Sequence, residues 1–144
     1  MVASVPLLDW AFSNGYKEDV SLQWYAAKFG TLEVMQYAYA NAKHVDIDPS
    51  QDSFICTGAA VRGHLEMLQW ARAQKFYWDS STTAAAARGG HQEVLQWAHA
   101  HGCPLDRKTW ACSGAVRGGH LHALQWLHEA VGIGEQLLGE QRLV

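Results

Sequence analysis

The stretch GHLEMLQWARA at residues 63–73 carries the strongest signal for the fold of this 144-residue chain. The chain repeats it as GHQEVLQWAHA at residues 90–100 and as GHLHALQWLHE at residues 119–129. Self-similarity at a regular period is the signature of a repeat architecture, in which each unit buries its apolar face only against its neighbours. The sequence therefore predicts a stack of similar units.

An aromatic residue marks the period of the repeat. It recurs in steps of 27, 33, 27 and 29 residues, at Trp10, Tyr37, Trp70, Trp97 and Trp126. An acidic residue follows nine positions after each aromatic, at Asp19, Asp46, Asp79, Asp106 and Glu135. These markers predict a single repeat domain over residues 1–144 with about four and a half units: a half repeat at 1–19, full repeats at 20–46, 47–79, 80–106 and 107–135, and a C-terminal cap or tail at 136–144.

Each full unit has the pattern of two helices joined by a tight turn. In the repeat 80–106, SSTTAAAARGG predicts a first helix with Ser80 or Ser81 as its N-cap, which Gly89 and Gly90 end. QEVLQWAHAH then predicts a second helix, which the following GCP ends. No stretch alternates polar and apolar residues as a strand does, so the fold class is all-α.

The turn between the two helices carries a recurring histidine. His64, His91 and His120 each follow a glycine, and Thr31 stands at the same place in the repeat 20–46. Because the residue there precedes a helix, we expect all four side chains to cap helix N-termini.

Apolar positions of the repeat predict its core. The repeat aromatics are expected to be buried in a ladder through the stack, since a buried ring removes about 150–250 Å² from water. The residue after the aromatic is small at Ala11, Ala38, Ala71 and Ala98, which compensates for the volume of the ring, and is larger only at Leu127. Cys56, Thr83 and Cys112 share one position of the first helix, where a small buried side chain is expected.

These motifs resemble the ankyrin repeat, whose pattern has AAxxGHxEVV at its centre. The matching stretches are AAKFGTLEVM at 26–35, AAVRGHLEML at 59–68 and AARGGHQEVL at 86–95, and the GHLEVLQWA-type sequences are similar to a tryptophan-rich ankyrin-like family. The resemblance implies an ankyrin-like helix-turn-helix repeat solenoid that binds other proteins and performs no chemistry. The TPLH motif is missing and two units have only 27 residues, so we expect little or no β-hairpin finger.

Composition narrows the classes of partner. The net charge of -3 argues against nucleic acid, and no apolar run approaches the ~20 residues that a membrane span needs. Three cysteines without a CxxC pair suggest neither a disulfide framework nor a zinc knuckle. We therefore expect an intracellular, cytoplasmic monomer that binds no nucleic acid, membrane, small-molecule substrate or cofactor.

The binding site is expected on the first helices. In ankyrin repeats, the two residues before Gly-His face the partner and vary with it, and here every full unit has one cation in that slot. One interpretation is that cations favour a helix C-terminus, and a compatible one is a basic strip that receives an acidic or phosphorylated segment. Aromatic residues with arginines are typical of binding hot spots, so the predicted partner-binding residues are Lys28, Phe29, Arg62, Arg88, Trp110 and Arg117. Trp24 is a further first-helix tryptophan that could be exposed.

Catalytic and metal sites are weaker alternatives. His99, His101 and Cys103 offer zinc-ligand chemistry, but residues two apart on a helix point to different faces. No glycine-rich oxyanion loop or nucleophile elbow accompanies a Cys-His pair. The function predicted is thus a non-enzymatic protein-protein interaction scaffold, and the alternative is a structural spacer or capping segment of a longer array.

Overall fold

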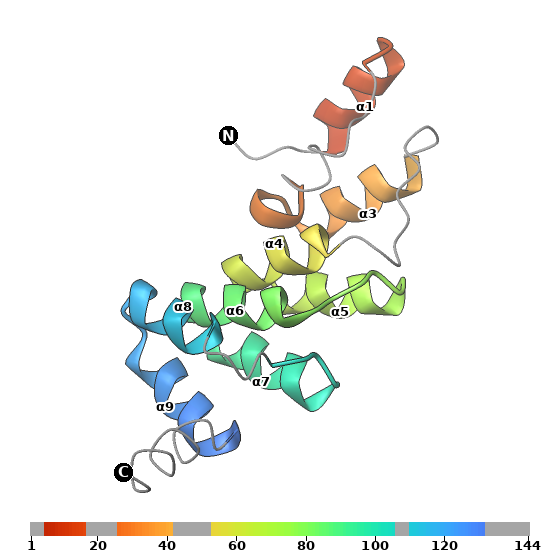
Figure 1. Cartoon of the computed structure of the whole chain (residues 1–144). Coiled ribbons are helices and arrows are strands. Elements are labelled where there is room, and N and C mark those ends of the chain that lie inside the picture. The colour runs from red at the N-terminus through yellow and green to blue at the C-terminus, as the bar shows by residue number, and fades with distance from the viewer. Residues whose placement is uncertain (1–4, 17–25, 42–52, 106–109, 132–144) are drawn as a thin grey trace, which may run out of the picture.

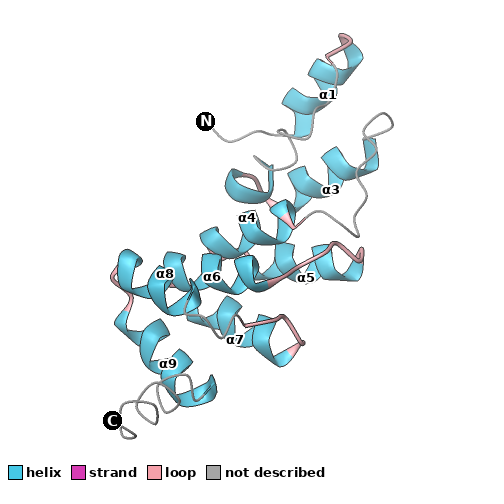
Figure 2. Ribbon diagram, in the orientation of Figure 1, coloured by secondary structure: helices cyan, strands magenta, loops and turns pink. Residues whose placement is uncertain are grey.

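The computed structural model describes residues 5–16, 26–41, 53–105 and 110–131, and within these ranges every regular element is a helix (Figures 1 and 2). The prediction of an all-α chain is confirmed for them, and the described loops contain no strand where a β-hairpin finger would lie. The helices are α1 (Val5–Ser13), α3 (Leu32–Asn41), α4 (Phe54–Arg62), α5 (Leu65–Ala73), α6 (Ser80–Gly89), α7 (Gln92–Ala100), α8 (Trp110–Gly118) and α9 (Leu121–Val131). Residues 26–29 are helical as well.

Consecutive helices form hairpins, α4 with α5, α6 with α7 and α8 with α9, which stack in chain order (Figure 1). The turn within each hairpin is the Gly-His dipeptide. Gly90 has φ of 74°, and its N–H together with that of His91 bonds the carbonyls of Ala87 and Ala86 at the end of α6. This left-handed cap ends the helix because only glycine adopts the conformation without cost.

The start of α6 differs from the prediction. Neither Ser80 nor Ser81 is its N-cap, because Asp79 takes that place and accepts a hydrogen bond from the Ser81 backbone N–H at 2.9 Å. A carboxylate is the stronger cap, since it also meets the positive end of the helix dipole. The acid nine residues after the repeat aromatic therefore begins the next unit here.

His64 and His91 lie at the predicted helix starts but do not cap them. His64 and His91 occupy the N-cap positions of α5 and α7, and neither side chain bonds a free N–H of its helix. Nε2 of His91 instead donates to the Val61 carbonyl of the preceding unit at 3.1 Å. Thr31 caps as predicted, because its hydroxyl accepts from the Val34 N–H at 3.3 Å.

Two rows of helices run through the stack (Figure 1). The first helices α4, α6 and α8 pack side by side, and their contacts dominate those between units. Alanine and glycine permit this approach. A Cβ on Gly89 would lie 2.4 Å from the Val61 carbonyl oxygen, and one on Gly118 would lie 2.2 Å from that of Arg88. The second helices contact one another less, so the first-helix row is the tighter side of the molecule.

The core lies between the rows and on the second helices. Its larger fully buried side chains include Met35, Met67, Leu68, Leu95 and Leu127. Ala38, Ala71 and Ala98 are buried as well, which agrees with a small residue beside the repeat aromatic. Leu127 replaces that alanine in the last hairpin and is equally buried, so this position is also shielded from solvent there.

The expected ladder of buried indoles is wrong. Trp70, Trp97 and Trp126 are half-buried, and Trp10 is 59% exposed. At three junctions between units, the side chain two positions after one unit's aromatic contacts the aromatic of the next unit. The pairs are Phe12–Tyr37, Tyr39–Trp70 and His99–Trp126, with ring centroids 6.3, 5.5 and 5.6 Å apart.

One junction uses a relay of a different composition. The residue two after Trp70 is Arg72, whose guanidinium lies 4.3 Å over the ring of Trp78. Trp78 is buried and meets Trp97 edge-on at 5.7 Å. Because Arg72 has no ring, the loop residue Trp78 makes the aromatic contact with Trp97 of the next unit.

The position shared by Cys56, Thr83 and Cys112 is buried in two of three units. Cys56 and Thr83 have no exposed surface, and Cys112 is partly exposed. Thr83 donates to the Pro104 carbonyl at 3.0 Å, and the Cys56 thiol faces the carbonyl of Phe76 at 4.0 Å. A small side chain with a donor thus ties the first helix to the loop that follows its hairpin.

Several sequence markers lie outside the described residues. These are Trp24, Asp19, Asp46, Asp106, Glu135, the end of the predicted repeat 20–46 with the start of 47–79, and the tail at 136–144.

Candidate first-helix groove

Most of the six predicted site residues are accessible. Phe29 is 42% exposed and Trp110 is 68% exposed, and the side chains of Arg62, Arg88 and Arg117 are exposed, whereas Lys28 is half-buried. The structure places these residues in two groups.

The first group centres on the ring of Phe29. The guanidinium of Arg62 lies 4.7 Å from the ring centroid, and the Lys28 ammonium lies 5.2 Å from it. Cation–π contacts of this kind contribute about 0.5–1 kcal/mol at exposed sites. Arg62 is thus engaged across a unit boundary and is not equivalent to the other arginines.

The slot before Gly-His explains this difference. It has two positions, and Arg62 occupies the second one, directly before Gly63. Arg88 and Arg117 occupy the first, because glycine must fill the second where the preceding unit's carbonyl lies so close. Arg62 therefore contacts Phe29, whereas Arg88 and Arg117 line the groove, although all three stand in the slot before Gly-His or Gly-Gly.

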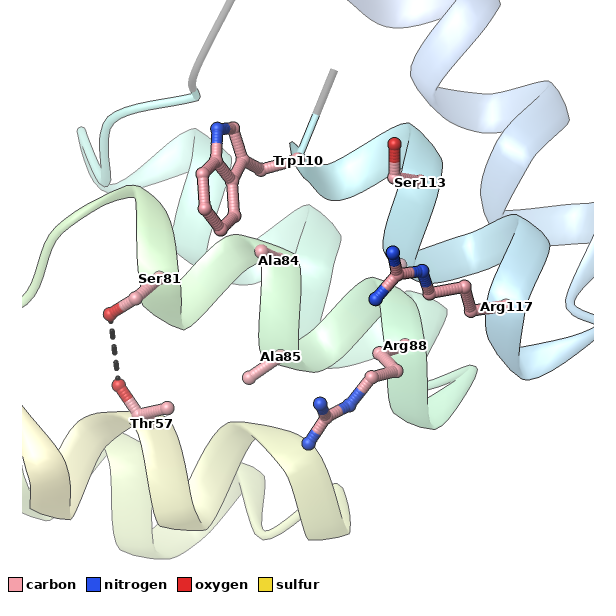
Figure 3. Close-up of a pocket in the computed structure, with 9 residues that line it drawn as sticks. Thr57, Ser81, Ala84, Ala85, Arg88, Trp110, Ser113 and Arg117 are labelled. Atoms are coloured by element: carbon pink, nitrogen blue, oxygen red, sulfur yellow. Dashed lines mark hydrogen bonds between the residues drawn. The ribbon is translucent and has the colours of Figure 1, made fainter. Parts of the chain in front are cut away.

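The second group lines a groove over α4, α6 and α8 with a volume of about 520 Å³ (Figure 3). Arg88, Trp110 and Arg117 are three of its lining residues. Trp110 stands at one end over α6, and the two arginines stand at the other end, as Figure 3 shows. The sequence-predicted residues at this groove are half of the six.

The groove follows a regular register on the helices. On α8 it is lined by Trp110, Ser113, Gly114 and Arg117, and on α6 by Ser81, Ala84, Ala85 and Arg88. Both sets are spaced i, i+3, i+4, i+7, which is one face of an α-helix. The structure thus assembles the groove from the same face of adjacent first helices.

Small residues form the floor. Ala84 and Ala85 lie between the aromatic and basic ends, and a Cβ on Gly114 would lie 2.9 Å from the Ala84 carbonyl oxygen. Larger side chains at these places would fill the groove, so the small residues that bring the helices together also keep it open.

Sequence reasoning missed the hydroxyl residues of the groove. Thr57 and Ser81 hydrogen-bond each other across α4 and α6 at 3.2 Å, and Ser113 lies on α8 (Figure 3). The i, i+3, i+4, i+7 register counted back from Arg88 and Arg117 would have found Ser81 and Ser113. Hydroxyls give such a groove donors and acceptors without a fixed charge.

The electrostatics of the groove are one-sided. No carboxylate is among the described residues that line it. Arg88 and Arg117 also have no ion-pair partner in the part of the chain that the structure describes. Both lie in the last turns of their helices, where a cation is favoured by about 0.3–1 kcal/mol. This accounts for their presence and leaves both guanidinium groups available to an anion.

The alternative zinc ligands lie in unrelated contacts. Nδ1 of His101 is 2.8 Å from the Trp97 carbonyl and its ring stacks on that indole, while His99 meets Trp126. Burial raises the pKa of the Cys103 thiol to about 12, so it stays protonated. No group of three potential metal ligands occurs among the residues described.

The described helices are all too short or too polar to cross a membrane. No known protein family, curated protein or solved structure matches the chain. The function must therefore be argued from the geometry of the first-helix groove.

Proposed function

We propose that the chain is an ankyrin-like repeat solenoid that binds a segment of a partner protein in the first-helix groove, as a monomeric, non-enzymatic scaffold. The likeness to ankyrin repeats in its sequence is supported by stacked helix hairpins with a glycine turn in each. The partner segment is acidic.

One observation carries the proposal. Two guanidinium groups and a largely exposed indole stand around a groove with a floor of small residues, and the described lining has no acid to neutralise them. A tryptophan and arginines in one concavity are the residue types that dominate binding energy at protein interfaces. An anionic segment would neutralise Arg88 and Arg117, for which the described lining supplies no carboxylate.

The scaffold favours this use because its surface is preformed. The groove lies on the row whose backbones are in closest contact, so binding need not order it first. A preorganised surface loses less conformational entropy on association and binds correspondingly tighter.

Selection from a random peptide display library tests the proposal. The purified 144-residue chain and its Arg88→Glu/Arg117→Glu variant are panned in parallel. The matched control is Lys75→Glu, which reverses an exposed charge outside the groove. We expect peptides rich in Asp and Glu from the wild type and the control, and none from the double variant. Captured peptides should dissociate when salt is raised, since the groove charges are exposed.

The spacer alternative makes the opposite prediction. A segment that only separates or caps neighbouring units would enrich no acidic peptides, and the three proteins would select indistinguishable pools. That result would rule out the groove as a binding site for acidic segments.

A further inference from the structure

We propose that the groove recognises two side chains of an unfolded segment, one anionic and one apolar, spaced three residues apart. The inference rests on the proposed function and specifies its ligand. The anionic side chain lies between Arg88 and Arg117, and the apolar one lies against Trp110 and the alanine floor.

The two ends of the groove differ in chemistry. Trp110 begins α8 and Arg117 lies seven residues later on the same helix face. With a rise of 1.5 Å per residue, these positions are about 10 Å apart along the helix axis. A ligand that uses both ends must present its two groups at a similar distance.

An extended segment spans this distance with few residues. It covers about 9 Å in three residues, whereas a ligand helix, which rises about 1.5 Å per residue, would need about six or seven residues to cover the same distance. The proposed ligand is therefore an extended segment.

A polyproline II conformation fits better than a β-strand. The groove walls are helices whose backbone groups are already bonded, and no strand edge lies among the described residues. A solvated polyproline II segment needs no backbone partner, and its three residues per turn put side chains i and i+3 on one side, about 9 Å apart. That spacing matches the distance between the groove ends.

The basic end favours a doubly charged group. Two arginines without a described partner, with the Ser113 hydroxyl on the helix face between Trp110 and Arg117, suit a phosphoserine, which has a charge of about −1.5 to −2. A single carboxylate would leave one guanidinium uncompensated. We therefore expect phosphoserine to bind more tightly than aspartate at this position.

Fluorescence anisotropy with short labelled peptides tests the inference on the whole chain. The set contains phosphoserine with leucine at spacings of one, three and five residues, the spacing-three peptide with serine for leucine, and the spacing-three peptide with aspartate for phosphoserine, each in both orders. We expect spacing three to bind best, and the loss of leucine to weaken it about tenfold, as partial burial of one leucine would.

Substitutions assign the two ends. Trp110→Ala should weaken the leucine peptide about tenfold and leave the serine peptide unchanged, whereas Arg88→Glu/Arg117→Glu should weaken both. Trp10→Ala is the matched control, because Trp10 is similarly exposed at 59% but lies on α1. Circular dichroism verifies that each variant is folded.

The outcomes separate the inference from the proposed function. If anionic peptides bind equally at all spacings, or if Trp110→Ala weakens all of them alike, two-point recognition is wrong and the groove remains an anionic-segment site. If no peptide binds, both proposals fall. Equal affinity for aspartate and phosphoserine would overturn the doubly charged ligand alone.

Discussion

The two rows of helices solve the same packing problem in opposite ways. Between the first helices, backbone meets backbone, as where Gly89 lies beneath the Val61 carbonyl. Between the second helices, bulky side chains span the gap, as where Tyr39 meets Trp70. Close-packed glycines tolerate no added atom, whereas half-buried rings can adjust. The small residues therefore set the spacing of the units, and the tryptophans fill the space that remains between the second helices.

The largest effect should follow from adding one methyl group to each close approach of the first row. Gly89→Ala together with Gly118→Ala would place a Cβ within 2.4 and 2.2 Å of a backbone oxygen of the preceding unit. Overpacking costs about 1–3 kcal/mol per site, and clashes this close to a backbone oxygen lie toward the upper end, so two sites, each less about 1 kcal/mol gained in helix propensity, leave a net loss of about 3 kcal/mol. We expect the free energy of unfolding to fall by about 3 kcal/mol, measured by urea titration with far-UV circular dichroism.

A glycine without a close neighbour provides the control. Gly102 has φ of +85°, and nothing lies within 4 Å of the position of its Cβ. Gly102→Ala should cost only the strain of a left-handed residue, about 1–2 kcal/mol. An equal loss at Gly102 and in the double variant would show that contact between the first helices does not set the spacing.

A smaller effect should follow from emptying the second row. Trp97 is half-buried, meets Trp78 edge-on and stacks on His101 at 4.3 Å. Complete burial would make Trp→Ala cost about 3–5 kcal/mol. We expect about half of that, near 2 kcal/mol, because part of the ring already faces water. The shift of the urea midpoint, with the dependence of the free energy of unfolding on urea concentration unchanged, measures this loss.

The equivalent residue at the beginning of the array sharpens this test. Trp10 is 59% exposed and has only Tyr16 as a described ring partner, at 6.2 Å. Trp10→Ala should therefore cost no more than about 0.5 kcal/mol, as surface substitutions do. If both variants lost the same stability, the repeat aromatic would not stabilise the stack through its contacts with neighbouring units.

The sequence predicts the helices well because they depend on local patterns. The glycine at the end of α6 and the apolar face of α7 are read directly from periodicity and turn chemistry. The N-cap of α6, Asp79, is also a repeat marker, but Ser and Asp are comparable N-caps, so local preference alone does not select it over the serines beside it. The buried indole ladder failed for a different reason: hydrophobicity measures what a ring gains from burial, whereas the neighbouring unit decides how much of it is covered.

The candidate site was predictable in part. Exposure of Trp110 and the cationic slot followed from repeat register. The division between Arg62 and the other two arginines did not, because it depends on a carbonyl of the preceding unit that excludes any Cβ at Gly89 and Gly118. Contacts between units are tertiary information, and one unit's sequence does not contain them.

His91 joins the two rows and gives the smallest expected effect. Its Nε2–H donates to the Val61 carbonyl, so an added proton would go to Nδ1, which faces Gly63. Burial lowers the pKa of His91 below its ordinary 6.5, the Val61 bond opposes that shift, and His120, His64 and Arg62 reinforce it. The unfolded chain therefore binds this proton more readily than the folded one.

Stability should consequently depend on pH through His91. The contribution of the neutral ring is complete above pH 6.5 and is lost as the pH falls below that value toward the lowered pKa of the folded state. His91→Gln keeps an N–H donor but cannot titrate, so it should lose less stability than the wild type between pH 7.5 and 5.5 in urea titrations. His122→Gln, at an exposed histidine of α9, should retain the wild-type loss. If the two variants lose the same stability between pH 7.5 and 5.5, the protonation of His91 does not affect its contact with Val61 between the two rows.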